Sequence, residues 1–258
     1  MTEIVAGSIV IALGVAHSVL GEMLIVGPLV ANRSWTPRIP RAFAGTLVRF
    51  TWHAASLAWF GLAAVLLGAP AGVAFGAVFL LAGTWMLVSA RRHPAWPLFL
   101  AAGLLGLDSA DALPRAVLGA IVVLGIVVAL AGSALHVAWA AGATAGRAHA
   151  LPEDPATLEP LGDPGPILTL AVAGAAAALA VLIAGTAWFD APASWWWVTA
   201  VAAVVATLRV VGDREHIGFM KTIDDTPFGR WDTRLYTPLF VVLAGAAVAS
   251  LCLAGRPG

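Results

Sequence analysis

The stretch TLRVVGDREHIGFMKTIDDTPFGRWDTRLYTPL, residues 207–239, decides how the rest of the chain is interpreted. It concentrates acidic, basic and histidine residues in a chain that has only 14 acidic and 14 basic residues over 258 positions. Apolar runs flank it on both sides. Such runs are typical of helices that cross a lipid bilayer. We therefore interpret the stretch as a polar loop that membrane helices hold at a membrane surface.

The composition of the whole chain indicates an integral membrane protein. Hydrophobic residues make up 60% of the sequence and charged residues only 11%, whereas soluble domains have about 25% charged residues. The formal net charge is zero, so no basic excess is present to neutralise the phosphates of a nucleic acid. A nucleic-acid partner is not predicted. The single cysteine, Cys252, excludes an internal disulfide and a cysteine metal cluster.

The apolar runs predict eight membrane-spanning helices. A span needs about 20 apolar residues, and continuous runs favour helices over barrel strands, which alternate and are shorter. The fourth run is the shortest, and its helix would rise only about 20 Å. Gly72 and Gly76, four residues apart in the third run, favour close helix packing. The predicted spans are residues 4–31, 46–68, 71–90, 95–107, 114–141, 165–188, 194–211 and 236–255.

The distribution of basic residues predicts the orientation of these spans. If all eight cross, twelve of the 14 basic residues lie on one side, and only Arg115 and Arg256 lie on the other. This asymmetry follows the positive-inside rule. If the fourth run did not cross, the second half would change sides and the asymmetry would nearly vanish. We predict a multi-pass protein of a bacterial plasma membrane with both termini outside the cytoplasm and cytoplasmic loops at 142–164 and 212–235.

A weak internal repeat divides the spans into two groups of four. LGVAHSVLGE (13–22) and AGSALHVAWAAG (131–142) each place one histidine in an apolar helix. RRHPAWPLF (91–99) and RLYTPLF (234–240) each combine basic residues with the sequence PLF. The predicted fold is therefore an all-α integral membrane protein built from two tandem four-helix halves, residues 1–111 and 112–258.

Three motifs of the second half resemble a known family. LHVAWAAG (135–142), LRVVGDREHIGFMK (208–221) and TPFGRWDTRLYTPL (226–239) are similar to the domain of unknown function 3995 family of small four-helix bacterial membrane proteins. The matched positions are His136, Trp139, Ala140, Gly142, Arg230, Trp231, Asp232, Thr233, Arg234, Tyr236, Pro238 and Leu239. Ala138 and Thr237 depart from the aromatic residue and the serine usual in the family.

This resemblance covers roughly residues 112–258 and implies a fold and a topology, but no reaction. The first half, with HSVLGE (17–22) and FTWHAASLAW (50–59), resembles short four-helix membrane proteins whose role is also unknown.

The first candidate site pairs Glu22 with His53. In the predicted topology both lie at a similar depth in the cytoplasmic leaflet, and Arg49 lies one turn from His53. Ionisable groups inside a membrane cost about 2.5–3.5 kcal/mol and usually find partners. We therefore expect Glu22 and His53 to meet. They either tie two helices together or transfer protons, because imidazole titrates near neutral pH.

The second candidate site is the charged group around the last loop. In one interpretation Asp213, Arg214, Arg230 and Arg234 form ion pairs that fix the loop, and Asp232 caps the last helix. In the other, Arg209 and the three loop arginines bind an anionic headgroup or a substrate phosphate, since guanidinium groups bind such anions in a bidentate manner.

A cofactor is not predicted. His17 and His136 could act as axial haem ligands or as metal ligands, because imidazole suits iron, zinc and copper. However, the sequence has no HExxH or CxxC pattern that would support such a site.

We predict a multi-span membrane protein whose cytoplasmic side binds a small lipid-soluble or anionic ligand. The predicted ligand-binding residues are His136, Trp139, Asp213, Arg214, Arg230, Arg234 and Tyr236. One alternative is an acid/base enzyme of the isomerase or cyclase type on an isoprenoid-like substrate, with Glu22 or Asp232 as acid and His53 as base. A second is a proton-coupled transporter, which is less favoured because nearly all polar residues lie on one predicted side.

Overall fold

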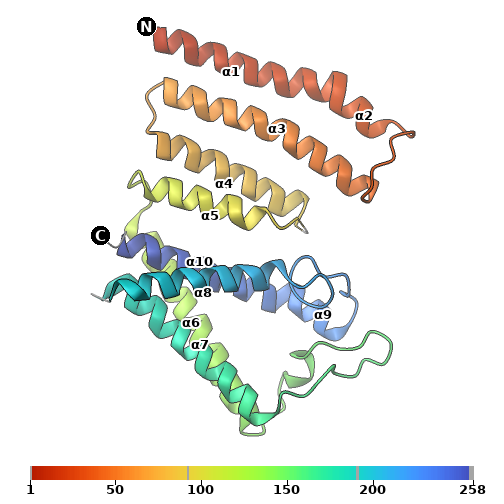
Figure 1. Ribbon diagram of the computed structural model, residues 1–258, viewed down its shortest axis with the longest axis vertical. Helices are drawn as coiled ribbons and strands as arrows, with labels where there is room; N and C mark the ends of the chain where they lie inside the picture. Colours follow the sequence, from red (N-terminus) through yellow and green to blue (C-terminus); the bar gives the residue numbers. More distant parts are fainter. Residues whose placement is uncertain (1, 92, 190–191, 256–258) are drawn as a thin grey trace. The chain divides into compact units, whose positions relative to one another are not determined.

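The computed structural model describes residues 2–91, 93–189 and 192–255, and nearly all of its regular structure is helical (Figure 1). Within these residues the only extended pairing is an isolated bridge between Glu153 and Pro160. The chain divides into two compact units, Met1–Leu113 and Pro114–Gly258. Arg92 and Arg256, which belong to the predicted charge asymmetry, lie outside the described residues.

The N-terminal unit contains four long helical segments that pack in sequence order. The first consists of α1 (Thr2–Gly21), a π-helical segment η1 (Glu22–Val26) and α2 (Gly27–Ala31). It is followed by α3 (Arg41–Leu66), α4 (Ala71–Ser89) and α5 (Trp96–Asp108). In Figure 1 α3 lies between α1 and α4, and α4 lies beside α5.

Glycines allow the close packing of this unit. Gly7, Gly14 and Gly21 of α1 are two helical turns apart and are buried. A Cβ atom at Gly14 would lie 2.7 Å from Phe60, and one at Gly21 would lie 2.0 Å from Trp52. The predicted close packing at Gly72 and Gly76 is confirmed, because Cβ atoms there would lie within 3.0 Å of atoms of α5 or of the residues that follow it. Because glycine has no side chain at these positions, the helices can approach each other closely.

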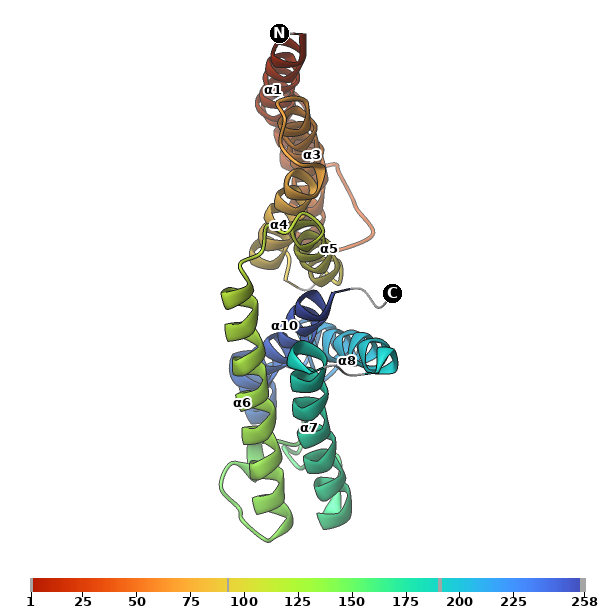
Figure 2. The ribbon, with the colours of Figure 1, turned by 90° about the vertical axis from the view of Figure 1, so that its left-hand side faces the viewer.

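The C-terminal unit is arranged around its last helix. Its elements are α6 (Arg115–Ala140), the short 3-10 helix η2 (Arg147–His149), α7 (Gly165–Trp188), α8 (Ala193–Val211), α9 (Pro227–Trp231), the π segment η3 (Asp232–Tyr236) and α10 (Thr237–Ala254). α10 packs against α6, α7 and α8, and Figure 2 shows α6 beside α7. Leu243, Ala246 and Ala247 are among the buried residues of α10.

Six helical stretches of the described chain are long and apolar enough to cross a membrane. They are Thr2–Ala31, Ala71–Ser89, Arg115–Ala140, Gly165–Trp188, Ala193–Val211 and Pro227–Ala254. The predicted all-helical membrane class is therefore confirmed. The remaining two predicted spans correspond to α3, which has 26 residues but is less apolar than the other long helices, and to α5, which has only 13 residues.

Two of the long helices contain a π-helical segment that the sequence analysis did not predict. In each, a proline follows within two residues of the π segment, Pro28 after η1 and Pro238 after η3. Proline has no N–H to donate and its ring crowds the carbonyl four residues earlier. The helix widens by one residue, and the amides of Gly27 and Thr237 bond to the carbonyls of Glu22 and Asp232. Each π segment therefore begins with an acidic residue.

Candidate functional site

The first polar site, the α1–α3 cluster, consists of His17, Ser18, Glu22, Arg49, His53 and Ser56. Glu22 accepts a hydrogen bond from Arg49 Nε at 2.8 Å through Oε1, and its Oε2 lies 3.4 Å from His53 Nε2. The side chains of Glu22 and His53 are 33% and 21% exposed. The expected contact between these two residues is confirmed, whereas their catalytic role stays a prediction.

Two serines extend the contact between Glu22 and His53 along the helices. Ser18 Oγ lies 2.8 Å from His53 Nδ1 and donates to Ser56 Oγ at 3.0 Å. Ser56, which is fully buried, lies 3.0 Å from His17 Nδ1. Hydrogen bonds thus connect the carboxylate of Glu22 with the imidazole of His17. The sequence analysis missed both serines, although Ser18 lies four residues before Glu22 and Ser56 three residues after His53, spacings that share a helix face.

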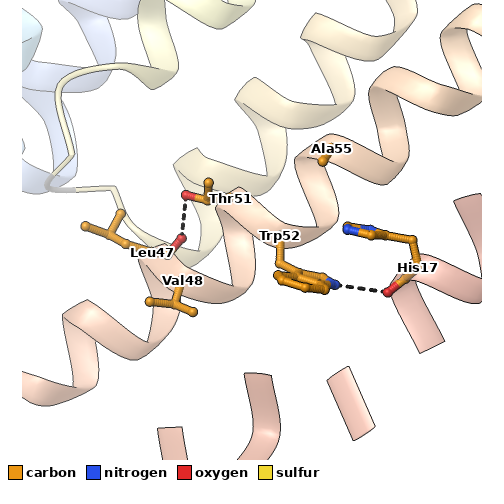
Figure 3. Close-up of a pocket in the computed structure, with 6 residues that line it drawn as sticks. All are labelled: His17, Leu47, Val48, Thr51, Trp52 and Ala55. Carbon is orange, nitrogen blue, oxygen red and sulfur yellow. Dashed lines mark hydrogen bonds between the residues drawn. The ribbon is translucent and has the colours of Figure 1, made fainter. Parts of the chain in front are cut away.

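A groove opens beside the end of this hydrogen-bond chain. It has a volume of about 400 Å³ and is lined by His17, Leu47, Val48, Thr51, Trp52 and Ala55. Figure 3 shows the rings of His17 and Trp52 face to face. Their centroids are 4.5 Å apart, and Trp52 Nε1 donates to the His17 carbonyl at 3.0 Å. Thr51 donates its hydroxyl to the Leu47 carbonyl. Among the residues that line the groove, His17 has the ionisable side chain.

The second polar site, the Asp232 cluster, surrounds one carboxylate with four donors. Oδ1 of Asp232 accepts from Arg209 Nη2 at 2.6 Å. Oδ2 accepts from Lys221 Nζ at 2.9 Å, from the Gly218 amide at 2.9 Å and from Thr237 Oγ1 at 3.0 Å. Asp232 is completely buried, and the Lys221 side chain is 3% exposed.

This geometry corrects the predicted capping role of Asp232. The last long helix begins at Pro227, inside the predicted loop 212–235, and its N-cap is Thr226, which accepts from the Gly229 amide. Asp232 instead lies within the helix, where η3 turns its carboxylate towards the loop after α8. Lys221 was not among the predicted site residues. The sequence does mark Lys221, because it is the single lysine in a chain with thirteen arginines.

Asp213 shapes the loop that the Asp232 cluster holds. Its Oδ1 accepts the amides of Glu215 and His216, both at 2.8 Å, and of Ile217 at 3.0 Å. Partial burial alone would raise the pKa of Asp213, but the three amide donors outweigh it and hold the pKa below the ordinary value of 3.8. Asp213 thus acts as a structural acceptor for the loop backbone.

Arg214 and Gly212 lie in the same loop in left-handed conformations. Arg214 has a φ of 74° and Gly212 a φ of 97°. A Cβ atom at Gly212 would lie 1.8 Å from the Ile217 carbonyl oxygen, so this turn requires glycine. The side chain of Arg214 is exposed.

Tyr236 and Trp231 hold the other predicted loop, residues 142–164. Tyr236 donates from its hydroxyl to the His149 carbonyl at 3.1 Å, and the rings of Trp231 and His149 stack at 6.5 Å. Glu153, which is buried, accepts from the Phe228 amide at 3.2 Å near the start of α9. The predicted ligand-binding residue Tyr236 therefore contacts the protein itself.

The remaining predicted ligand-binding residues do not join these clusters in the described structure. His136 bonds through Nδ1 to the Gly132 carbonyl at 2.8 Å, and its ring contacts Trp139 edge to face at 4.9 Å. Trp139 donates to the Ala145 carbonyl. Arg230 donates to the Asp225 carbonyl.

Three of the four arginines considered for anion binding are exposed. They are Arg214, Arg230 and Arg234, whereas Arg209 forms a salt bridge with Asp232. Binding of an anionic ligand by the three exposed arginines stays a prediction. Within the described residues, no group of three His, Cys, Asp or Glu side chains is arranged to hold a metal ion.

Comparison with known proteins supports the resemblance of the second half. Residues 128–247 match a family model described as protein of unknown function (DUF3995). No curated protein and no solved structure matches the chain. The C-terminal half thus resembles this family, as its motifs predicted, and the resemblance of the first half to short membrane proteins stays a prediction.

Proposed function

We propose that this multi-pass membrane protein binds a small lipid-soluble ligand in its N-terminal unit, beside His17 and Trp52, and exchanges protons with it through Glu22 and His53. The observation that carries the proposal is the difference between the two acidic residues that begin the π segments. Both Glu22 and Asp232 pair with an arginine of another helix, Arg49 and Arg209 respectively.

The two acids differ in the hydrogen bonds that they can still form. Asp232 is completely buried and accepts four hydrogen bonds, so a proton or a ligand has no route to its oxygens without breaking the cluster. Glu22 is one-third exposed and has two side-chain partners. This contrast supports Glu22 and His53 as the pair that exchanges protons with water and Asp232 as a structural residue.

The surroundings of Glu22 favour a lipid-soluble ligand. The groove that begins at His17 is lined mainly by apolar side chains, and it lies between segments that are rich in apolar residues. An apolar molecule would be enriched in the membrane that surrounds these helices. An acid and an imidazole that share a proton suit acid/base chemistry of the isomerase type. If the protein is an enzyme, we therefore propose that it catalyses a reaction of this type.

We also propose the complete topology that the sequence predicts: eight spans in two tandem four-helix halves, in a bacterial plasma membrane, with both termini outside the cytoplasm. Two observations support it. α3 is 26 residues long, enough to cross about 30 Å of hydrocarbon. α5 is short, but it packs along α4 with glycines at the contact, and its crossing keeps the basic residues on one side.

The experiment is mass spectrometry of lipid-soluble molecules that co-purify with the protein in detergent. We expect a discrete compound with the wild type that is depleted from Glu22→Gln and His53→Ala. It should be retained by the matched controls Glu159→Gln and His216→Ala, which change the same residue types outside the cluster. Circular dichroism checks that all variants are folded.

Three results would contradict the proposal. The first is that no discrete compound co-purifies with the wild-type protein. The second is that Glu22→Gln and His53→Ala both retain the compound. The third is a haem absorption band in the wild-type protein that disappears in His17→Ala, which would indicate that His17 binds haem.

A further inference from the structure

We infer that the α1–α3 cluster is a directed proton relay that ends at His17, and that His17 is the residue that protonates and deprotonates an enolisable carbonyl compound with an apolar chain. This inference rests on the proposed function and adds the path, the terminal group and the substrate class. His17 is the ionisable side chain of the groove, whereas Glu22 and His53 do not line it. A proton from the Glu22–His53 pair therefore needs connecting groups to reach a ligand there.

Two hydroxyl groups supply the connection. The distances along the path are 3.4 Å from Glu22 to His53, 2.8 Å from His53 to Ser18, 3.0 Å from Ser18 to Ser56 and 3.0 Å from Ser56 to His17. Each hydroxyl can donate one hydrogen bond and accept others. Each serine is thus placed to accept a proton from one neighbour while it gives its own to the next.

The hydrogen bonds have one consistent direction. Ser18 donates to Ser56, so Ser18 accepts from Nδ1–H of His53, and Ser56 donates to Nδ1 of His17. The proton of neutral His17 is then on Nε2. Within the described residues His17 Nε2 has no hydrogen-bond partner, and the ring borders the groove. The chain therefore presents an N–H donor to a bound ligand.

The first half-reaction delivers a proton to the ligand. The Nε2–H bond of His17 breaks and an O–H bond forms at the ligand's carbonyl oxygen. Nδ1 of His17 takes the Ser56 proton, Ser56 takes that of Ser18, and Ser18 takes that of His53 Nδ1. His53 begins this step as an imidazolium, with Nδ1–H towards Ser18 and Nε2–H towards the Glu22 carboxylate, and ends it neutral with the proton on Nε2. The ligand gains the positive charge that His53 loses, and Glu22 stays a carboxylate paired with Arg49, so charge is conserved.

The second half-reaction runs the relay in reverse. Nε2 of His17 now has a free electron pair and removes a proton from the carbon beside the carbonyl. The electron pair of that C–H bond forms the C=C bond of an enol, and the relay returns a proton to Nδ1 of His53. All groups recover their first state, and no oxidant or second substrate is needed. A site with this cycle suits enolisation and double-bond isomerisation.

The apolar lining limits the substrate class. Thr51, the other polar side chain of the groove, donates its hydroxyl to its own helix. One donor in an otherwise apolar groove matches a molecule with one carbonyl oxygen on a hydrocarbon chain. Farnesylacetone, an isoprenoid ketone, is therefore a suitable probe.

The test measures deuterium uptake at the α-carbons of farnesylacetone in D₂O with the full-length protein. The wild type should accelerate uptake over protein-free detergent. His17→Ala, Ser56→Ala and Ser18→Ala should each lower the rate by about 100-fold, the lower end of the usual contribution of acid/base groups. Ser89→Ala, which changes an exposed serine of α4 outside both the groove and the relay, should keep the rate within about threefold of wild type.

A second measurement observes the protons of the relay directly. Nitrogen-15 NMR of histidine-labelled wild-type protein should show neutral His17 with its proton on Nε2 and His53 with a proton on both ring nitrogens. Ser56→Ala should remove the response of His17 to Glu22→Gln, which a merely structural serine would not affect. The opposite tautomer of His17, or normal deuterium uptake in Ser56→Ala, would overturn the relay.

The remaining outcomes separate this inference from the proposed function. If farnesylacetone displaces the co-purified compound from the wild type but gains no deuterium, the relay is wrong and ligand binding stands. If there is neither a co-purified compound nor uptake, both are wrong. Covalent labelling of Ser18 by a fluorophosphonate would overturn the relay in favour of a nucleophilic serine, because Ser18, His53 and Glu22 are also connected in the order that such chemistry uses.

Discussion

Lys221 and Asp232 form a salt bridge of 2.9 Å in which the side chains are 3% and 0% exposed. Arg209 of α8 binds the other oxygen of the carboxylate at 2.6 Å. Such buried pairs contribute little over an apolar replacement, but removing one partner leaves an uncompensated buried charge. The bridge ties the loop after α8 to η3, while Trp231 and Tyr236 on the same turns hold the loop after α6. The motif RWDTRLY therefore fixes both loops of its unit.

Asp232→Asn is expected to destabilise the protein by about 3–5 kcal/mol, because Lys221 and Arg209 would then lack a buried counter-charge. Unfolding in detergent, followed by circular dichroism, measures the change. Asp225→Asn is the matched control, since Asp225 is exposed, and its effect should stay within about 0.5 kcal/mol. Equal stabilities of the two variants would show that the Asp232 cluster is not a structural centre.

Lys221→Met and Asp232→Leu should be strongly non-additive. Each single change leaves charge in a dry site, whereas the double variant removes the pair and leaves only Arg209, which is 20% exposed. We expect a coupling energy of about 0.5–3 kcal/mol in a double-mutant cycle. The same unfolding experiment supplies the four stabilities. Additive effects would indicate that the two side chains do not interact in the folded protein.

Gly21→Ala is expected to disrupt the contact between α1 and α3, because the new Cβ would lie 2.0 Å from Trp52 Nε1. Overpacking of this kind costs about 1–3 kcal/mol. Gly119→Ala is the control, since a Cβ there meets no atom within 4 Å, and alanine in a helix is favoured by about 1 kcal/mol. The melting temperature should therefore fall for Gly21→Ala and stay constant or rise for Gly119→Ala. A fall in both would mean that packing at Gly21 is not the cause.

The sequence was sufficient for the helices because their lengths and apolar character are properties of continuous segments. It was also sufficient for the contact between Glu22 and His53, since depth along two adjacent antiparallel helices can be counted from the loop that joins them. The predicted start of the last helix was wrong, because residues 227–235 are too polar to extend the apolar run, whereas the helix begins at Pro227. This is why Asp232 was placed at a helix end and not in the interior.

Other parts of the sites depend on contacts that local patterns do not specify. Lys221 reaches Asp232 only because the loop turns back, with the Phe219 amide bonded to the Val210 carbonyl. Ser18 and Ser56 have little effect on hydropathy, so no apolar pattern reveals them. Their role becomes visible only when α1 and α3 are paired in register.

The proposed topology predicts the accessibility of introduced cysteines in a Cys252→Ala background. If all eight helices cross, Ala112→Cys faces the outside, and Thr36→Cys and Thr157→Cys face the cytoplasm. A membrane-impermeant maleimide should label the first in intact bacterial cells and the other two only after lysis. All three positions are exposed in the structure. Labelling of Thr157→Cys but not Ala112→Cys in intact cells would mean that α3 or α5 does not cross.

The loop after α8 should lose its protection in acid through Asp213. The pKa of Asp213 in the folded protein lies below the ordinary value of 3.8 because three amides donate to its carboxylate. A lowered folded-state pKa contributes stability that is fully present above the unfolded value and is lost as the pH falls through the folded value. Protection should therefore be constant from pH 7 to about pH 5 and decrease below pH 3.8.

Hydrogen–deuterium exchange of the Glu215, His216 and Ile217 amides, corrected for the intrinsic effect of pH, measures this protection. Asp213→Asn removes the ionisable group, so its residual protection should be lower than wild type at pH 7 and nearly independent of pH. Asp225→Asn should follow the wild-type curve. Loss of protection in the wild type between pH 7 and pH 5 would show that the carboxylate of Asp213 does not control this loop.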